Sequence, residues 1–135
     1  MSFNTISVIG LGYIGLPTAA MFASKKKKVI GVDVNHHAVD TINAGKIHIV
    51  EPDLDVMVRK AVEGGFLKAA TSPEPADAFL IAVPTPFLPT ASEGEIPQPN
   101  LTYIQSAAES IAKVLKKGDL VILESTSPVG TTEQM

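Results

Sequence analysis

The 135-residue sequence contains no cysteine and no tryptophan, and only 5% of its residues are aromatic. Without cysteine, the chain has no disulfide, no thiolate metal site and no catalytic thiol of its own. The formal net charge is −3, and the 11 basic residues do not gather into a stripe. Nucleic acid is therefore not expected as a partner. The length indicates one domain that is long enough to bury a core.

Charged residues are also absent from the segment Ser2 to Ser24, which is followed by the basic run Lys25 to Lys28. This pattern has the hydropathy of a membrane span or a signal anchor. Three glycines and Pro17 interrupt the segment, however, and no basic region precedes it. We therefore expect no membrane insertion, lysines at the solvated end of a helix and, because no targeting signal is recognised, a cytoplasmic protein.

The same segment contains Gly10-Leu11-Gly12-Tyr13-Ile14-Gly15, a G-x-G-x-x-G with a strand-like run before it and a helix-like run after it. Asp33 follows Gly15 by 18 residues, at the end of a second apolar run, 29–32. A strand, a glycine-rich turn, a helix and an acid at this spacing form the fingerprint of a dinucleotide-binding site. The alternative is a glycine-rich turn without a ligand.

Each position of this motif has an expected role. Gly10 turns the chain sharply off the strand, Gly12 leaves room for a pyrophosphate beside the backbone, and Gly15 lets the helix pack closely on the strand. The backbone N–H groups of Tyr13 and Ile14 lie in the first turn of the helix. Unpaired donors and the positive end of the helix dipole attract a diphosphate there.

Asp33 is expected to select the cofactor. Its carboxylate can accept hydrogen bonds from both hydroxyls of a ribose, and it repels a 2′-phosphate. For two unit charges 4 Å apart, the repulsion is about 4 kcal/mol at an effective dielectric constant near 20, before solvent screening. No arginine at positions 34–38 compensates for it. The sequence therefore predicts NAD rather than NADP.

Short apolar strands alternate with helices along the chain, which predicts an α/β fold with a doubly wound parallel sheet of the Rossmann type. The expected strand order is 3-2-1-4-5, and Met21 and Met57 are expected in the core. The expected strands are 5–9, 28–34, 67–70, 78–83 and 120–124. The expected helices are 13–24, one from Asn35 to Gly45, one from Pro52 to Gly64, and 101–116 with Leu101, Ile104, Ala108, Ile111 and Leu115 facing inward.

Ligands of such sheets bind outside the carboxyl ends of the strands, where the strand order reverses, here between the first and fourth strands. The segments Val83 to Pro86 and Glu124 to Gly130 should therefore face the cofactor, with Pro84, Thr85 and Thr126 among them. Ordinary turns would also place proline, serine and threonine there. Five prolines between Pro84 and Pro99 predict a long loop, which is typical of a lid, a binding loop or a disordered segment.

Taken together, Gly10 to Pro17, Asp33, Val83 to Pro86 and Ser125 to Gly130 resemble the N-terminal part of the UDP-glucose/GDP-mannose dehydrogenase family. The resemblance covers the whole chain. It implies NAD as cofactor, a UDP-sugar as substrate and a homodimeric parent. The runs 1–50 and 122–130 most resemble members that oxidise UDP-N-acetyl-D-mannosamine to its uronic acid for surface polysaccharides such as enterobacterial common antigen. UDP-glucose or another nucleotide sugar stays open.

The resemblance also implies roles for single residues. Tyr13 and Ile14 would bind the diphosphate, Asp33 the adenosine ribose and Thr85 the other half of NAD. Thr126 would lie beside the nicotinamide in an auxiliary catalytic role. Family members oxidise a primary alcohol to a carboxylate in two hydride transfers, through a cysteine-bound thiohemiacetal and thioester.

The chain departs from the family pattern because it has no cysteine and stops at Met135. The catalytic lysine and cysteine, the dimerisation helix and the UDP-sugar domain of the family would follow that point. We therefore expect residues 1–135 to be a truncated NAD-binding domain that binds NAD weakly and does not turn over. A helix is expected to begin near Thr131.

Two other functions stay open on the fingerprint alone. One is an NAD-sensing regulatory domain without enzymatic activity, and the other is a different dehydrogenase, such as a β-hydroxyacid dehydrogenase. The proline-rich loop and the motif at 125–130 disfavour the first. The fingerprint that contains Tyr13, together with the motifs at 83–86 and 125–130, disfavours the second. His36 and His37 are adjacent and point in different directions, and His48 is distant in sequence, so no metal site is expected.

Overall fold

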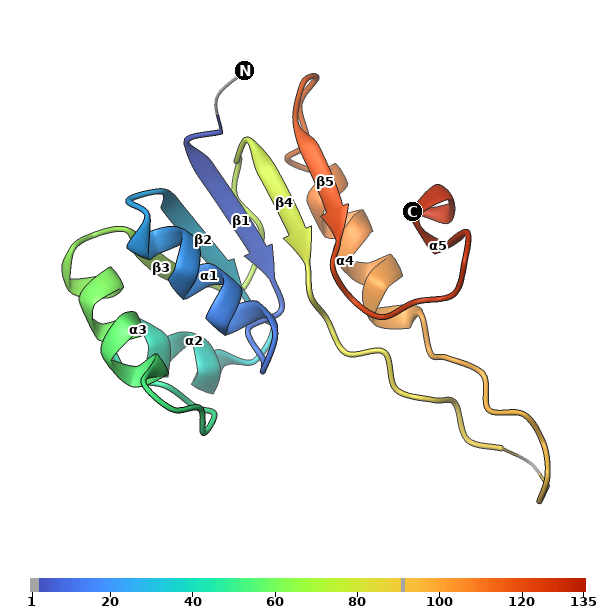
Figure 1. The fold of residues 1–135 in the computed structure, drawn as a ribbon. Coiled ribbons are helices and arrows are strands. Elements are labelled where there is room, and N and C mark those ends of the chain that lie inside the picture. The colour runs from blue at the N-terminus through green and yellow to red at the C-terminus, as the bar shows by residue number, and fades with distance from the viewer. Residues whose placement is uncertain (1–2, 91) are drawn as a thin grey trace.

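The structure, a computed structural model, describes residues 3–90 and 92–135. At its centre is an all-parallel, five-stranded sheet in the order β3-β2-β1-β4-β5, which confirms the predicted doubly wound Rossmann-type fold (Figure 1). The register places Val8 of β1 between Gly31 of β2 and Leu80 of β4. The strands are β1 Thr5–Ile9, β2 Lys28–Val32, β3 Leu67–Ala70, β4 Ala78–Ile81 and β5 Leu120–Leu123.

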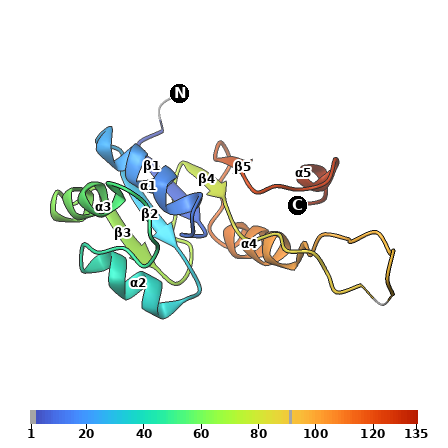
Figure 2. The same ribbon diagram turned by 60° about the horizontal axis from the view of Figure 1, so that its bottom comes forward.

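Helices cover both faces of the sheet, as the crossovers between parallel strands require. Helices α1, α2 and α3 lie on one face, and α4 lies on the other (Figures 1 and 2). The helices are α1 Gly15–Ser24, α2 His36–Asn43, α3 Leu54–Glu63, α4 Thr102–Ala112 and α5 Thr131–Gln134. In the part of the chain that the structure describes, no helix is long and apolar enough to cross a membrane.

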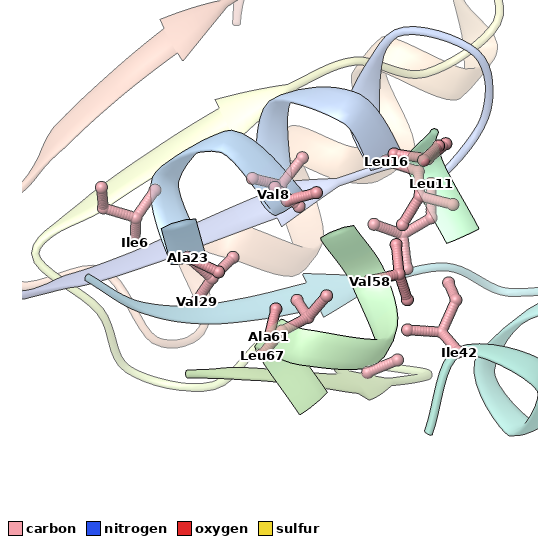
Figure 3. Close-up of a cluster of buried hydrophobic side chains, with 14 of the residues drawn as sticks. Ile6, Val8, Leu11, Leu16, Ala23, Val29, Ile42, Val58, Ala61 and Leu67 are labelled. Atoms are coloured by element: carbon pink, nitrogen blue, oxygen red, sulfur yellow. The ribbon is translucent and has the colours of Figure 1, made fainter. Parts of the chain in front are cut away.

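Two clusters of buried hydrophobic side chains hold the helices on the sheet. Strand β1 contributes to both clusters because its side chains alternate between the two faces: Val8 packs with the first and Ile9 with the second. The first cluster joins α1, α2 and α3 to the sheet (Figure 3). The second surrounds the fully buried Phe79 of β4 and includes Ile111 of α4. Each large apolar side chain contributes roughly 1.5–3 kcal/mol when fully buried. The strand ends that carry the predicted site are thus set in a packed frame.

Several elements are shorter than predicted, and local hydrogen bonds give the reason. Strand β2 ends at Val32, because the Asp33 carboxylate accepts the N–H of Asn35 and turns the chain. Helix α4 ends at Ala112 rather than at residue 116, where the i→i+3 hydrogen bond from Val114 N–H to Ile111 O replaces the α-helical pattern. Helix α1 begins at Gly15 rather than at residue 13, and β4 and β5 end before the predicted residues 83 and 124.

Some side chains that were expected inside are exposed. Met21 is 47% exposed and Met57 is 38% exposed, because neither falls on the buried stripe of its helix. Leu115 is exposed because α4 has already ended. On α4 the buried alanine is Ala107, one position before the predicted Ala108. In contrast, α2 begins where predicted, with the Asn35 side chain accepting the N–H of Ala38.

The proline-rich connection between β4 and α4 is an extended arm that projects from the body of the domain (Figure 1). Phe87 pairs with Pro99 in an antiparallel bridge, and the Leu88 N–H donates to Gln98 O at 2.7 Å. Residue 91 of this arm lies outside the described part. The predicted loop is therefore a two-stranded arm at its base, and its Phe87 ring is exposed.

Candidate functional site

The glycine-rich turn follows β1 at the carboxyl edge of the sheet. Gly10 has φ +96° and donates its N–H to Val32 O at 2.7 Å, which ties the turn to the end of β2. A Cβ at Gly10 would overlap the Ala82 carbonyl, and one at Gly15 would overlap the Gly10 carbonyl. Both positions therefore exclude any other residue. Gly12 differs, because a Cβ there would meet nothing within 4 Å. The space beside the Gly12 backbone is open, as a cradle for a diphosphate must be.

The N-terminus of α1 follows this turn directly and carries free backbone donors. Tyr13 and Ile14 precede the helix and are both exposed, and no side chain caps it. Among the described residues, no acceptor takes the backbone N–H groups of Tyr13 and Ile14. Unpaired N–H groups at the positive end of a ten-residue helix are suited to an anionic group.

Asp33 lies at the end of β2, next to the glycine-rich turn. Its Oδ2 accepts the Leu11 N–H at 3.0 Å, and its Oδ1 accepts the Asn35 N–H at 2.9 Å. The side chain is half-buried. Each carboxylate oxygen has a second lone pair, so the group can still accept two hydroxyl hydrogens from a ribose.

A cavity of about 220 Å³ opens beside Asp33 at the carboxyl ends of β1, β2 and β4. Its lining is mostly apolar, with α4 forming one wall. This volume suits one part of a dinucleotide rather than the whole molecule. The lining residues are Ile9, Gly10, Val32, Asp33, Val34, Thr71, Pro73, Val83, Pro84, Tyr103, Ser106, Ala107 and Ser110.

Most of this lining was not predicted from the sequence. Thr71 could have been found, because it directly follows β3 at the same sheet edge. The wall from α4 carries Tyr103, Ser106, Ala107 and Ser110, which share one helical face. The inward-facing residues predicted for this helix were all assigned to the core, so the helix residues that line the cavity were missed.

The segments after β4 and β5 lie side by side. The Ser125 hydroxyl donates to Val83 O at 3.0 Å and to Ile81 O at 3.2 Å. Thr85 is half-buried and Thr126 is exposed, and neither lines the cavity. The structure thus brings Gly10, Asp33 and Pro84 to one cavity. Gly12 to Gly15 follow Gly10 in the same turn but do not line the cavity. Thr85 and Thr126 lie on the neighbouring strand ends.

Asp77, a carboxylate with a shifted pKa, lies at the amino ends of the strands, away from the cavity. Asp77 accepts the backbone N–H groups of Thr5 and Asn4, each at 2.9 Å to Oδ2. These two donors, Thr5 first, hold the pKa of Asp77 below its usual value. The group lies at the amino ends of β1 and β4 and has no part in the cavity. Within residues 3–90 and 92–135, no cluster of three His, Asp or Glu side chains could hold a metal ion.

Comparison with known proteins decides between the functions left open by the fingerprint. The UDP-glucose/GDP-mannose dehydrogenase family, NAD binding domain, matches residues 4–135. The chain belongs to this family. NAD is accordingly the cofactor of this domain. The two alternative functions, an NAD-sensing regulatory domain and a β-hydroxyacid dehydrogenase, are no longer considered.

Relatives in this family share much of the sequence. The UDP-N-acetyl-D-mannosamine dehydrogenase of Yersinia pestis is 73% identical over 135 residues, which is 100% of this chain and 31% of that protein. An NDP-N-acetyl-D-galactosaminuronic acid dehydrogenase of Ralstonia nicotianae is 67% identical over the same length, which is 30% of that protein. The chain thus spans about a third of the length of these relatives.

A solved structure agrees with the fold. The UDP-N-acetyl-mannosamine dehydrogenase Cap5O from Staphylococcus aureus superposes with a TM-score of 0.89 at 39% identity. The match covers 97% of this chain and 31% of that one.

Proposed function

We propose that residues 1–135 are the NAD-binding portion of a nucleotide-sugar 6-dehydrogenase that oxidises UDP-N-acetyl-D-mannosamine to its uronic acid. The observation that carries the cofactor part is the cavity beside Asp33, which is lined by Gly10 of the turn that leads into the α1 N-terminus. The 73% identity to a UDP-N-acetyl-D-mannosamine dehydrogenase supports the choice of sugar. A homodimeric parent in the cytoplasm, acting in surface polysaccharide synthesis, is part of the same proposal.

In this proposal the adenosine of NAD occupies the cavity, and Asp33 accepts the hydroxyls of its ribose. The diphosphate lies beside Gly12, on the N–H groups of Tyr13 and Ile14. Thr85 and Thr126 contact the other half of the cofactor from the ends of β4 and β5. When bound, NAD supplies hydride acceptance. The residues of this chain bind and orient it.

Asp33 also carries the proposed preference for NAD. A 2′-phosphate on the adenosine ribose would lie next to the carboxylate that already accepts the Leu11 and Asn35 N–H groups. Because Asp33 is half-buried, solvent screens part of the repulsion. A residual penalty of about 1.4 kcal/mol is a factor of ten in affinity. Val34, at the cavity wall, offers no positive charge to a 2′-phosphate.

Calorimetric titration of the purified chain with NAD and with NADP tests the cofactor assignment. We expect NAD to bind at least about tenfold more tightly than NADP. The matched variant Asp33→Asn removes the charge but keeps an oxygen acceptor, and we expect it to narrow the difference between the two cofactors. Equal affinity for NAD and NADP in the unsubstituted chain, or binding of neither, would contradict the assignment.

The sugar is tested in a longer protein that carries this domain. The 135-residue sequence has no cysteine, so we expect no sugar-dependent NADH formation from this chain alone. The full-length dehydrogenase should oxidise UDP-N-acetyl-D-mannosamine in preference to UDP-N-acetyl-D-galactosamine and UDP-glucose, as measured by kcat/KM. A preference for the galactosamine derivative would favour the function named for the Ralstonia relative.

A further inference from the structure

The carboxylate of Asp33 is engaged by the protein itself. Oδ2 accepts the Leu11 N–H at 3.0 Å, and Oδ1 accepts the Asn35 N–H at 2.9 Å. Leu11 lies between Gly10 and Gly12 in the glycine-rich turn, and Asn35 caps α2. One side chain therefore joins the end of β2 to the turn after β1 and to the start of the next helix.

The Leu11 N–H bond to Asp33 is the second hydrogen bond that holds the turn to the end of β2, after the one from Gly10 N–H to Val32 O at 2.7 Å. The Leu11 side chain is 1% exposed, and it packs so closely on β2 that a Cβ at Gly31 would come within 2.8 Å of it. Its N–H has no other acceptor among the described residues. Without the Asp33 oxygen, this part-buried donor would be unsatisfied, and the turn would move to reach another partner or water.

We propose that Asp33 is a positioning residue for the diphosphate, acting through Leu11 to hold the backbone from Gly12 to Ile14 in its binding conformation. This inference deepens the proposed NAD site and rests on it. Its consequence is specific. Removal of the Asp33 carboxylate lowers the affinity for a nucleoside diphosphate even when its ribose has no hydroxyl that could donate a hydrogen bond to Asp33. A role limited to ribose recognition gives no such effect.

The test measures by calorimetry the affinities of two nucleotides for three proteins: the unsubstituted chain, Asp33→Ala and Asp33→Asn. ADP carries both ribose hydroxyls, and 2′,3′-dideoxyadenosine diphosphate (ddADP) carries neither. In Asp33→Ala we expect the affinity for ddADP to fall roughly tenfold, because the turn loses its anchor. In Asp33→Asn the amide oxygen can still accept the Leu11 N–H, so ddADP should bind within about threefold of the unsubstituted chain. ADP should be weakened in both variants.

A control separates this effect from a general loss of stability. Val29 is buried at the amino end of β2, at the opposite edge of the sheet from Asp33. Val29→Ala destabilises the domain through a core cavity. It removes neither of the hydrogen bonds that hold the turn, from Leu11 N–H to Asp33 and from Gly10 N–H to Val32 O. We expect it to lower the melting temperature without changing the affinity for ddADP.

Hydrogen exchange of the Leu11 amide, followed by NMR without nucleotide, is the second readout. At equal global stability, the Leu11 amide should exchange faster in Asp33→Ala than in Val29→Ala. In Asp33→Asn its exchange rate should return toward that of the unsubstituted chain. Unchanged affinity for ddADP in Asp33→Ala, or failure of the unsubstituted chain to bind ddADP while it binds ADP, overturns the inference. If the chain binds neither ADP nor NAD, the proposed function fails. An unchanged exchange rate of the Leu11 amide in Asp33→Ala overturns the positioning role by itself.

Discussion

The Ser125 hydroxyl donates a hydrogen bond to the Val83 carbonyl at 3.0 Å, and this contact ties the end of β5 to the end of β4. The same hydroxyl lies 3.2 Å from the Ile81 carbonyl. The Ser125 side chain therefore adds to the backbone bonds from the Glu124 and Ser125 N–H groups to Ile81 O. Together they join two segments that were predicted separately to face the cofactor. The hydroxyl points into the protein rather than toward a ligand.

Replacement of Ser125 should act on only one half of the cofactor. In Ser125→Ala the segments carrying Thr85 and Thr126 lose the side-chain hydrogen bond to Val83 O. The backbone bonds from the Glu124 and Ser125 N–H groups to Ile81 O remain, so we expect NAD affinity to fall only about fivefold, for a loss near 1 kcal/mol. ADP, which occupies the adenosine side, should bind unchanged. Ser125→Thr, which keeps the hydroxyl, should restore NAD affinity, and Ser127→Ala serves as the matched control. Equal losses for NAD and ADP would contradict this role.

The glycines of the turn should separate folding from binding. Gly10→Ala combines a positive φ with overlap of the Ala82 carbonyl, and we expect the free energy of unfolding to fall by roughly 3 kcal/mol. Gly12→Ala meets open space and a permitted φ, so it should change stability by less than about 1 kcal/mol. The methyl group added by Gly12→Ala would nevertheless occupy the space beside the diphosphate and lower the affinity for NAD. Chemical denaturation and titration of both variants measure the contrast. A Gly12→Ala variant that binds NAD normally would argue against the open space as the diphosphate position.

The cavity wall on α4 offers a test of where adenosine binds. Ser110 lines the cavity, whereas the neighbouring Glu109 is exposed and does not. We expect Ser110→Leu to fill part of the cavity and to weaken both ADP and NAD by more than about tenfold. Glu109→Leu introduces the same side chain on the outer surface and should leave both affinities unaltered. Titration of the two variants with ADP decides the matter, and an unaffected Ser110→Leu would place adenosine elsewhere.

The end of α1 contains a site for stabilisation. Lys26 has φ +62° and closes the helix with two backbone hydrogen bonds, from its own N–H to Ala23 O and from Lys27 N–H to Phe22 O. This is the position where glycine is favoured. We expect Lys26→Gly to raise the free energy of unfolding by roughly 0.5–1 kcal/mol. Lys25→Gly, at a residue with φ −92°, should lower it instead. Urea denaturation measures both, and a destabilised Lys26→Gly would contradict the strain.

Asp77 predicts a pH dependence of stability. The N–H groups of Thr5 and Asn4 hold its pKa in the folded state below the usual value. A carboxyl whose pKa is lowered by folding contributes stability that is fully present above its unfolded pKa, about 3.9, and is lost as the pH falls through the lower folded pKa. Asp77→Asn should therefore have a lower melting temperature at pH 7, and the difference should shrink as the pH drops below about 4. Asp40→Asn makes the same charge change on the exposed side of α2 and is the control. A difference that stays constant down to low pH would contradict the role of the Asp77 charge.

Local patterns in the sequence were sufficient for the order of elements and the strand order. The glycine spacing, the apolar runs and the position of Asp33 are short-range features, and a parallel sheet admits few arrangements of them. The Asn35 cap could be predicted for the same reason, since it involves residues three apart. Element ends were predicted less well, because side chains such as Asp33 and Asp119 capture backbone N–H groups there and stop the regular pattern.

The fold, the family and the glycine-rich turn could therefore be predicted from the amino acids alone, because the motifs that indicate them are short runs of neighbouring residues. The cavity could not be predicted in this way, since its walls come from the ends of β1, β2 and β4 and from α4, which lie far apart along the chain and meet only in the folded domain. The folded domain likewise determines that the Asp33 carboxylate faces Leu11 and that the Ser125 hydroxyl faces the end of β4. The direction of a side chain and its hydrogen-bond partner depend on how the strand ends meet in space, and no local pattern contains that information.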